Sequence, residues 1–166
     1  MRTFHHRTRS SLGLELAAVV LLVPACPALA GGAVESPGRL PALLDATGLK
    51  YMMQDDTTGV LLLRGENGTH VVTVRLLDEL VAAFAEIVEV QEDNVPAALW
   101  KKAAEVNARP SLAHVGYARE KAKFYAISGY PGAQDVTGAL LKAMITDVAL
   151  LADELQPAFR DLLAVE

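Results

Sequence analysis

The sequence has a single cysteine, Cys26, among 166 residues. An intrachain disulfide needs two cysteines, so no disulfide can support the fold. The length is that of one domain with room for a core, and 52% hydrophobic with 21% charged residues is typical of a globular chain. We therefore expect a single domain stabilised by a hydrophobic core.

Catalytic and metal-binding signatures are also missing. Two histidines, His70 and His114, follow the first 30 residues, and neither H-x-x-x-H nor H-E-x-x-H spacing occurs. The G-x-S-x-G nucleophile elbow, a glycine-rich phosphate loop and the EF-hand pattern are absent as well. We expect a non-enzymatic protein with no catalytic residue, cofactor or metal. A small secreted enzyme with an unrecognised site is the alternative.

Positive charge is scarce. Residues 1–30 contain three of the 15 basic residues and one of the 20 acidic ones, so the remaining chain has 12 basic and 19 acidic groups, a net charge of −7. Nucleic acids and anionic lipid surfaces are bound mainly through basic side chains. The charge balance therefore argues against a nucleic-acid partner.

The first 30 residues have the order of a secretory signal peptide. A basic segment, residues 1–10, precedes an apolar run, and Ala28 and Ala30 form an A-x-A cleavage site before Gly31. The apolar run contains Glu15 and suits a signal better than a membrane span of about twenty residues. We expect export to the periplasm or outside the cell, with no transmembrane span after cleavage.

This interpretation divides the chain into a signal peptide over 1–30, a linker over 31–37 and a domain over 38–166. A second interpretation depends on Cys26. The sequence Val-Pro-Ala-Cys that ends at this residue resembles a bacterial lipobox, although proline on both sides of the Ala-Cys pair is atypical. A lipid-anchored envelope protein is therefore the alternative to a freely exported one.

Apolar periodicity and turn residues predict a helix, three or four strands, a second helix, two strands and a long last helix. The expected elements are a helix over 39–48, a strand over 49–54, a hairpin over 61–76, a strand or helix over 79–90, a helix within 92–110, a hairpin of strands 112–118 and 123–128, and a helix over 135–165. Residues 129–135 are expected to form a loop.

Four of these elements carry further local expectations. The segment 79–90 has helical spacing as well as strand character. In the middle helix, Asn94 or Val95 is expected to be the cap, with Pro96 in the first turn. Pro157 is expected to kink or break the last helix near that point, because proline removes the backbone bond to Asp153. Two phenylalanines are expected in the core, Phe84 and Phe124.

The hairpin has the clearest local signal. Asn67-Gly68 between two apolar runs predicts a two-residue type I′ turn, in which both residues have positive φ. This turn pairs Leu63 with Val72 and Leu61 with Val74 on a core-facing side. The opposite side then carries six residues: Val60, Leu62, Arg64, Val71, Thr73 and Arg75.

Four segments of the sequence resemble the YbjN family of bacterial proteins: "LLDATGLKY", "ENGTHVVTVRL", "EVNAR" and "DELQPAF". The resemblance covers roughly residues 38–165. It implies an α+β fold similar to type III secretion chaperones, with an antiparallel sheet and helices packed on one side. It further implies a strand at 79–90, which makes the order of the nine elements α-β-β-β-β-α-β-β-α. It also implies a role in protein interaction or regulation and no known catalytic residues. Such chaperones work in the cytoplasm, so an exported chain is not expected to have their specific function.

If helices cover one side of the sheet only, the six-residue side of the hairpin remains exposed. Its aliphatic side chains flanked by arginines and a threonine resemble an apolar patch with a polar rim. We therefore expect this side to contact a protein partner or a second copy in a homodimer. Burial under the first helix or under residues 129–135 is the competing expectation.

Overall fold

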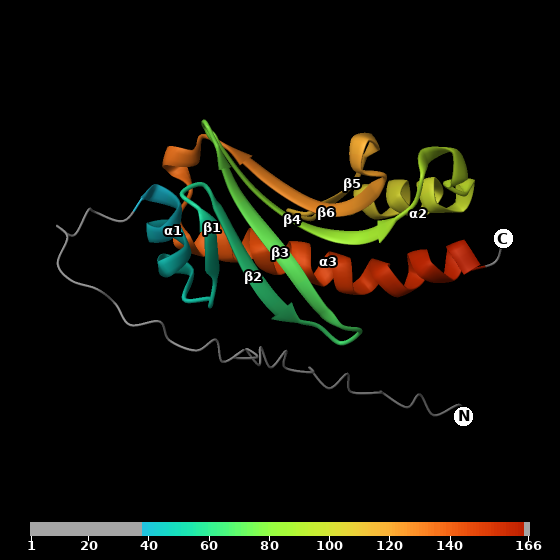
Figure 1. Cartoon of the computed structure of the whole chain (residues 1–166), viewed down its shortest axis with the longest axis horizontal. Helices are drawn as coiled ribbons and strands as arrows, with labels where there is room; N and C mark the ends of the chain where they lie inside the picture. Colours follow the sequence, from blue (N-terminus) through green and yellow to red (C-terminus); the bar gives the residue numbers. More distant parts are fainter. Residues whose placement is uncertain (1–37, 165–166) are drawn as a thin grey trace, which may run out of the picture.

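The computed structural model describes residues 38–164, so Cys26 and the cleavage-site residues Ala28, Ala30 and Gly31 lie outside the described part. Figure 1 shows the arrangement of its helices and strands. The elements are α1 (Arg39–Thr47), β1 (Met52–Asp55), β2 (Thr58–Arg64), β3 (Thr69–Leu77), β4 (Leu80–Glu89), η1 (Glu92–Asn94), α2 (Ala97–Asn107), β5 (His114–Ala118), η2 (Arg119–Lys121), β6 (Lys123–Pro131), η3 (Ala133–Asp135) and α3 (Gly138–Ala164).

The strands form one antiparallel sheet of six, in the order β1-β2-β3-β4-β6-β5. The long helix α3 crosses behind this sheet and packs against β3, β4 and β6, while α1 packs on α3 and β2, and α2 packs on β5 (Figure 1). All three helices lie on the same side of the sheet. The expected α+β fold, with helices packed on one side of an antiparallel sheet, is confirmed.

The core lies between this inner side of the sheet and α3. Burial alternates along each central strand, because successive side chains point to opposite sides of a sheet. The α3 stripe that meets these strands consists of Leu141, Met144, Ile145, Val148, Leu151, Ala152, Leu155 and Phe159, all buried. Burial of such an apolar stripe is the main stabilising contribution for a fold without disulfides.

Segment 79–90 is a strand, as the family resemblance implies. β4 pairs with β3 on one edge and with β6 on the other. Its buried residues Val81, Ala83, Ala85 and Ile87 recur every second position. Pairing on both edges thus overrides the local helical spacing, because each backbone N–H and C=O already has a partner in the sheet.

The register of the β2–β3 hairpin differs from the sequence prediction. Arg64 pairs with Thr69, Leu63 with His70 and Leu61 with Val72, and the Gly65 N–H donates to the Gly68 carbonyl at 2.7 Å, so the turn is centred on Glu66 and Asn67 rather than on Asn67 and Gly68. Neither Asn67 nor Gly68 has a positive φ, which excludes the expected type I′ turn. The shift is two residues, and because side chains alternate with a period of two, both sides of the hairpin keep their predicted composition.

The turn is held by a contact with α3 that no local pattern encodes. The carboxylate of Asp153 accepts hydrogen bonds from the backbone N–H groups of Glu66 and Asn67, each at 2.9 Å. It also bonds His70 Nε2 at 2.8 Å, and both side chains of this pair are buried. A Cβ atom on Gly65 would collide with the same carboxylate.

Pro157 does not break α3, which is continuous over Gly138–Ala164. Of the kink or break expected at this position, the break is therefore wrong, and the kink stays a prediction. Proline leaves the carbonyl oxygen of Asp153 without its intrahelical donor. Asn67 supplies the replacement, since its Nδ2 donates to that oxygen at 3.0 Å. The hairpin loop thus compensates the hydrogen bond that the proline removes.

Other local boundaries also differ from expectation. α2 begins at Ala97 with Pro96 at the N-cap, and Asn94 lies in η1 instead of capping the helix. The cause is that proline disfavours helical geometry in the residue before it, and Val95 is accordingly extended. The expected loop at 129–135 is strand up to Pro131, which pairs with Leu80 at the end of β4.

We predict that Asn67 and Pro157 are energetically coupled. Asn67→Ala should cost about 1–3 kcal/mol, because the Asp153 carbonyl loses its hydrogen-bond donor. In a Pro157→Ala background the cost should fall by about 1 kcal/mol, since the N–H of an alanine at 157 can donate to the same carbonyl. Urea unfolding of the four proteins in the double-mutant cycle measures this. Asn94→Ala, at an exposed position in η1, is the control, and strictly additive effects contradict the coupling.

Candidate functional site

The side of the sheet opposite the helices is the candidate site, and we call it the outer face. One row of cross-strand partners runs across all six strands: Met52, Val60, Thr73, Phe84, Ile127 and His114. The next row toward the β2–β3 turn contains the pairs Leu62–Val71 and Glu86–Tyr125. The next row away from that turn contains Arg75, Ala82 and Gly129. The middle of the outer face is therefore mostly apolar.

The outer face is exposed, in contrast to the inner one. Met52 is 65% exposed, Val71 53% and Leu62 42%, whereas Leu61 and Val72, their strand neighbours, are 1% exposed or less. No helix of the described residues packs on this side. Single exposed aliphatics are ordinary on a protein surface, but a contiguous apolar group across paired strands is typical of an interaction surface.

The six residues singled out from the sequence, Val60, Leu62, Arg64, Val71, Thr73 and Arg75, do share this face. Neither α1 nor residues 129–135 cover it. The sequence prediction missed the contribution of the other strands. Phe84 in particular is not a core residue as expected: it lies half-buried on the outer face, edge-on to Tyr125. Phe124, by contrast, is buried as expected.

Charged groups surround the apolar rows. Lys123 Nζ lies 2.7 Å from a carboxylate oxygen of Glu86 and 3.3 Å from one of Glu89, and these hydrogen bonds raise the pKa of the lysine. Burial raises the pKa of the nearby Tyr125 hydroxyl. The remaining cations of this face are Arg64 and Arg75, and none of the ion pairs found among residues 38–164 includes them.

The two edges of the sheet offer a partner fewer free backbone groups and less surface than its outer face does. At one edge, the side chain of Asn107 occupies the backbone groups of Val115 in β5: its Oδ1 accepts from Val115 N at 2.7 Å, and its Nδ2 donates to Val115 O at 2.9 Å. At the other edge, β1 has four residues and an irregular register between Met53 and Asp55. Short or blocked edges discourage addition of a further strand, which leaves the outer face as the larger surface for a partner.

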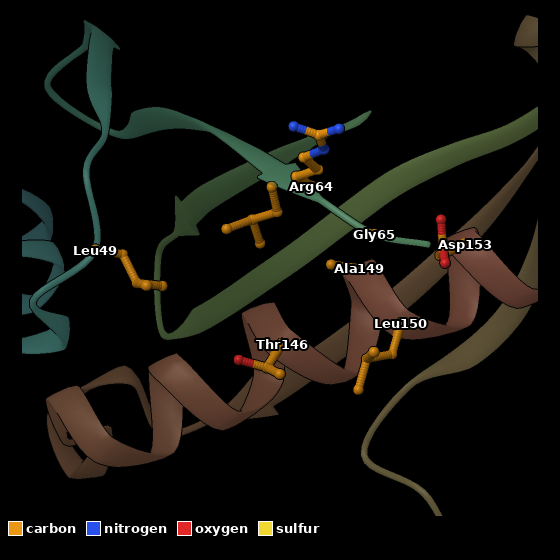
Figure 2. A pocket seen from close by; sticks show the side chains of 8 residues that line it. Leu49, Arg64, Gly65, Thr146, Ala149, Leu150 and Asp153 are labelled. Carbon is orange, nitrogen blue, oxygen red and sulfur yellow. The ribbon is translucent and has the colours of Figure 1, made fainter. Parts of the chain in front are cut away.

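Figure 2 shows a pocket beside Asp153, under the end of β2. It is lined by Leu49, Leu63, Arg64, Gly65, Thr146, Ala149, Leu150 and Asp153 and has a volume of about 20 Å³. One water molecule needs roughly that volume, and a metabolite needs a pocket of roughly 300 Å³ or more. An open groove of about 230 Å³ lies between α3 and the residues before β5, and it too is below that size.

The two histidines of the described chain lie far apart in the fold. His70 is buried against Asp153, and His114 is exposed on the outermost strand, β5. Among residues 38–164, no group of three His, Cys, Asp or Glu side chains is arranged to bind a metal ion. Within the same range, no helix has the length and apolar character needed to cross a membrane.

Asp153 is ionised under ordinary conditions despite its burial. Burial raises the pKa of the carboxyl, but the hydrogen bonds from His70 and from the N–H groups of Asn67 and Glu66 lower it, and their effect is the larger. The pKa of Asp153 therefore lies below its usual value. An ionised carboxylate makes stronger hydrogen bonds than a neutral one, which strengthens the link between α3 and the hairpin.

A family model called YbjN, described as "Putative bacterial sensory transduction regulator", matches residues 36–161. The matched range contains every helix and strand described above except the last residues of α3. A comparison with curated proteins gives no match.

Solved structures share the fold. E. coli YbjN has 17% sequence identity and a TM-score of 0.51, over 74% of this chain and 90% of that one. A chain of the HopA1–SchA chaperone–effector complex has 14% identity and a TM-score of 0.53, over 74% and 96%. A chain of the ExoU–SpcU heterodimer, from the type III secretion system of Pseudomonas aeruginosa, has 14% identity and a TM-score of 0.52, over 72% and 97%. Identities this low establish similarity of fold alone.

We predict a pH-dependent role for Asp153 in stability. Because its folded-state pKa is lowered, its contribution is complete above the unfolded-state pKa of about 3.9 and is lost as the pH falls through the folded-state value. Asp153→Asn should cost about 1–3 kcal/mol at pH 7, and the difference from wild type should shrink below about pH 4. Urea unfolding between pH 7 and pH 3 tests this. Asp161→Asn, on the exposed part of α3, is the control; equal stabilities at pH 7 refute the prediction.

Proposed function

The chain belongs to the YbjN family, and from that membership and its exposed outer face we propose that it is an exported, non-enzymatic protein-interaction module with a chaperone-like or regulatory role. The observation that carries the proposal is a mostly apolar row of side chains that crosses all six strands, with no helix over it. A soluble domain normally covers such a surface with another element or with another protein.

The shape and charge of the outer face favour a protein over other ligands. Its apolar side chains lie on a broad sheet, whereas small molecules are bound in enclosed pockets. The chain after residue 30 has a net charge of −7, which disfavours nucleic acids. Aromatic and aliphatic residues in the centre with arginines at the edge, as found around Phe84 with Arg64 and Arg75, are the composition of protein interfaces.

The solved structures of similar fold are consistent with a protein partner. One is described as a chaperone–effector complex and another as a heterodimer from a type III secretion system. Those partners belong to those proteins. For this chain, the basic segment, apolar run and A-x-A site of residues 1–30 support export. An exported chain cannot serve a cytoplasmic secretion machine, so we place its partner in the envelope or outside the cell.

The export part of the proposal predicts the mass of the mature protein. Intact-mass analysis of protein recovered from the periplasm or culture fluid should give a chain that starts at Gly31. A chain that starts at a lipid-modified Cys26 would instead establish the lipid-anchored alternative, and Cys26→Ser should then release it from membranes. Full-length protein recovered solely from the cytoplasm refutes export.

The interaction part predicts that the outer face is needed for partner recovery. Tagged mature wild type should recover a protein from the envelope or culture fluid that Leu62→Lys does not, because the lysine places a charge in the apolar row. Leu112→Lys is the matched control: Leu112 is 45% exposed, and its N–H is bonded to Asp147 on α3, away from the outer face. Recovery of the same protein in equal amounts by all three contradicts the proposal.

A further inference from the structure

We infer that a second copy of this chain occupies the outer face, so that the protein forms a two-fold dimer in which two sheets pack face to face. This inference rests on the proposed function and specifies its partner. Three properties of the face carry it: its size, its twisted shape and the arrangement of its charges.

The size of the outer face is sufficient for a dimer. One row of outward side chains crosses all six strands, and the rows on either side of it cross five and four strands. With strands about 4.8 Å apart and rows about 6.6 Å apart, the area is about 450–500 Å² for each copy, or about 900–1,000 Å² for two. A specific interface needs about 1,000 Å² in total. The face is therefore at the lower end of the range for a stable dimer.

The shape of the face favours another sheet over a helix. A helix with its side chains is about 10 Å wide, so a single helix would leave most of the six strands uncovered. Two sheets stack with their strands within about 30° of each other because both have the same handed twist. The outer face of a second copy has the same twist and the same width, and it meets both requirements without any further protein.

The charges of the face complement each other across a two-fold axis. Arg75 lies one row to one side of the Thr73–Phe84 row, and Glu86 lies one row to the other side, on the neighbouring strand. A two-fold axis that crosses the strands over the Thr73–Phe84 row exchanges these two sides. Each Arg75, which has no ion-pair partner within residues 38–164, then lies near Glu86 of the other copy.

The test is the solution mass of the mature protein. Light scattering at about 100 μM protein should give twice the chain mass, because a dimer with a Kd of about 1 μM is almost fully associated at that concentration. Leu62→Lys and Val71→Lys should raise the Kd by more than about tenfold, and Leu112→Lys should leave it unchanged. Urea unfolding of each variant at a concentration where all are monomeric confirms that loss of the dimer does not reflect loss of the fold.

Charge reversal tests the two-fold arrangement. Arg75→Glu and Glu86→Arg should each weaken the dimer, because each places like charges together across the axis, and the double variant should recover most of the affinity. Single reversals without effect on the Kd refute this arrangement, and a monomeric wild type refutes the dimer itself. If wild type is monomeric, the recovery experiment still tests the proposed function. A different protein that binds wild type and not Leu62→Lys would support that function without the dimer.

Discussion

Asp153 links the longest helix to the hairpin on which the outer face is built. Its carboxylate accepts the backbone N–H groups of Glu66 and Asn67 and bonds His70, while its carbonyl, freed by Pro157, accepts the side chain of Asn67. These bonds join residues more than 80 positions apart in the chain, and they hold the turn in the position that goes with the observed pairing of β2 with β3. They also position α3 against the inner side of the sheet.

Because α3 is attached there, the inner and outer sides of the sheet have different roles. The inner side is covered by helices: α1, α2 and α3 pack on it, and the side chains between the helices and the sheet are buried. The outer side has no helix left to cover it. One edge is closed by Asn107, and the other is short and irregular. A partner that adds to this fold therefore finds most of its contact area on the face, which explains why the proposed interaction depends on side chains rather than on strand addition.

Three motifs behind the family resemblance have structural explanations. The "ENG" of the hairpin and the proline of "DELQPAF" meet at the Asp153 carbonyl. The asparagine of "EVNAR" closes the β5 edge. Their common property is that each satisfies backbone groups that the fold leaves without a regular partner, and unpaired buried groups of this kind are costly. These positions preserve a fold and do not specify a reaction, which agrees with a function based on a surface.

The sequence by itself determined the order of the elements other than 79–90, the helix that ends near residue 48 and the division of the hairpin into an apolar and a mixed side, because helical and strand periodicity are local properties of the chain. Tertiary structure alone decided the hairpin register, the continuity of α3 through Pro157 and the position of Phe84 on the outer face. Each of these depends on a partner distant in sequence: a carboxylate on α3, a side chain on the hairpin and the strand neighbours of β4. No local pattern contains that information.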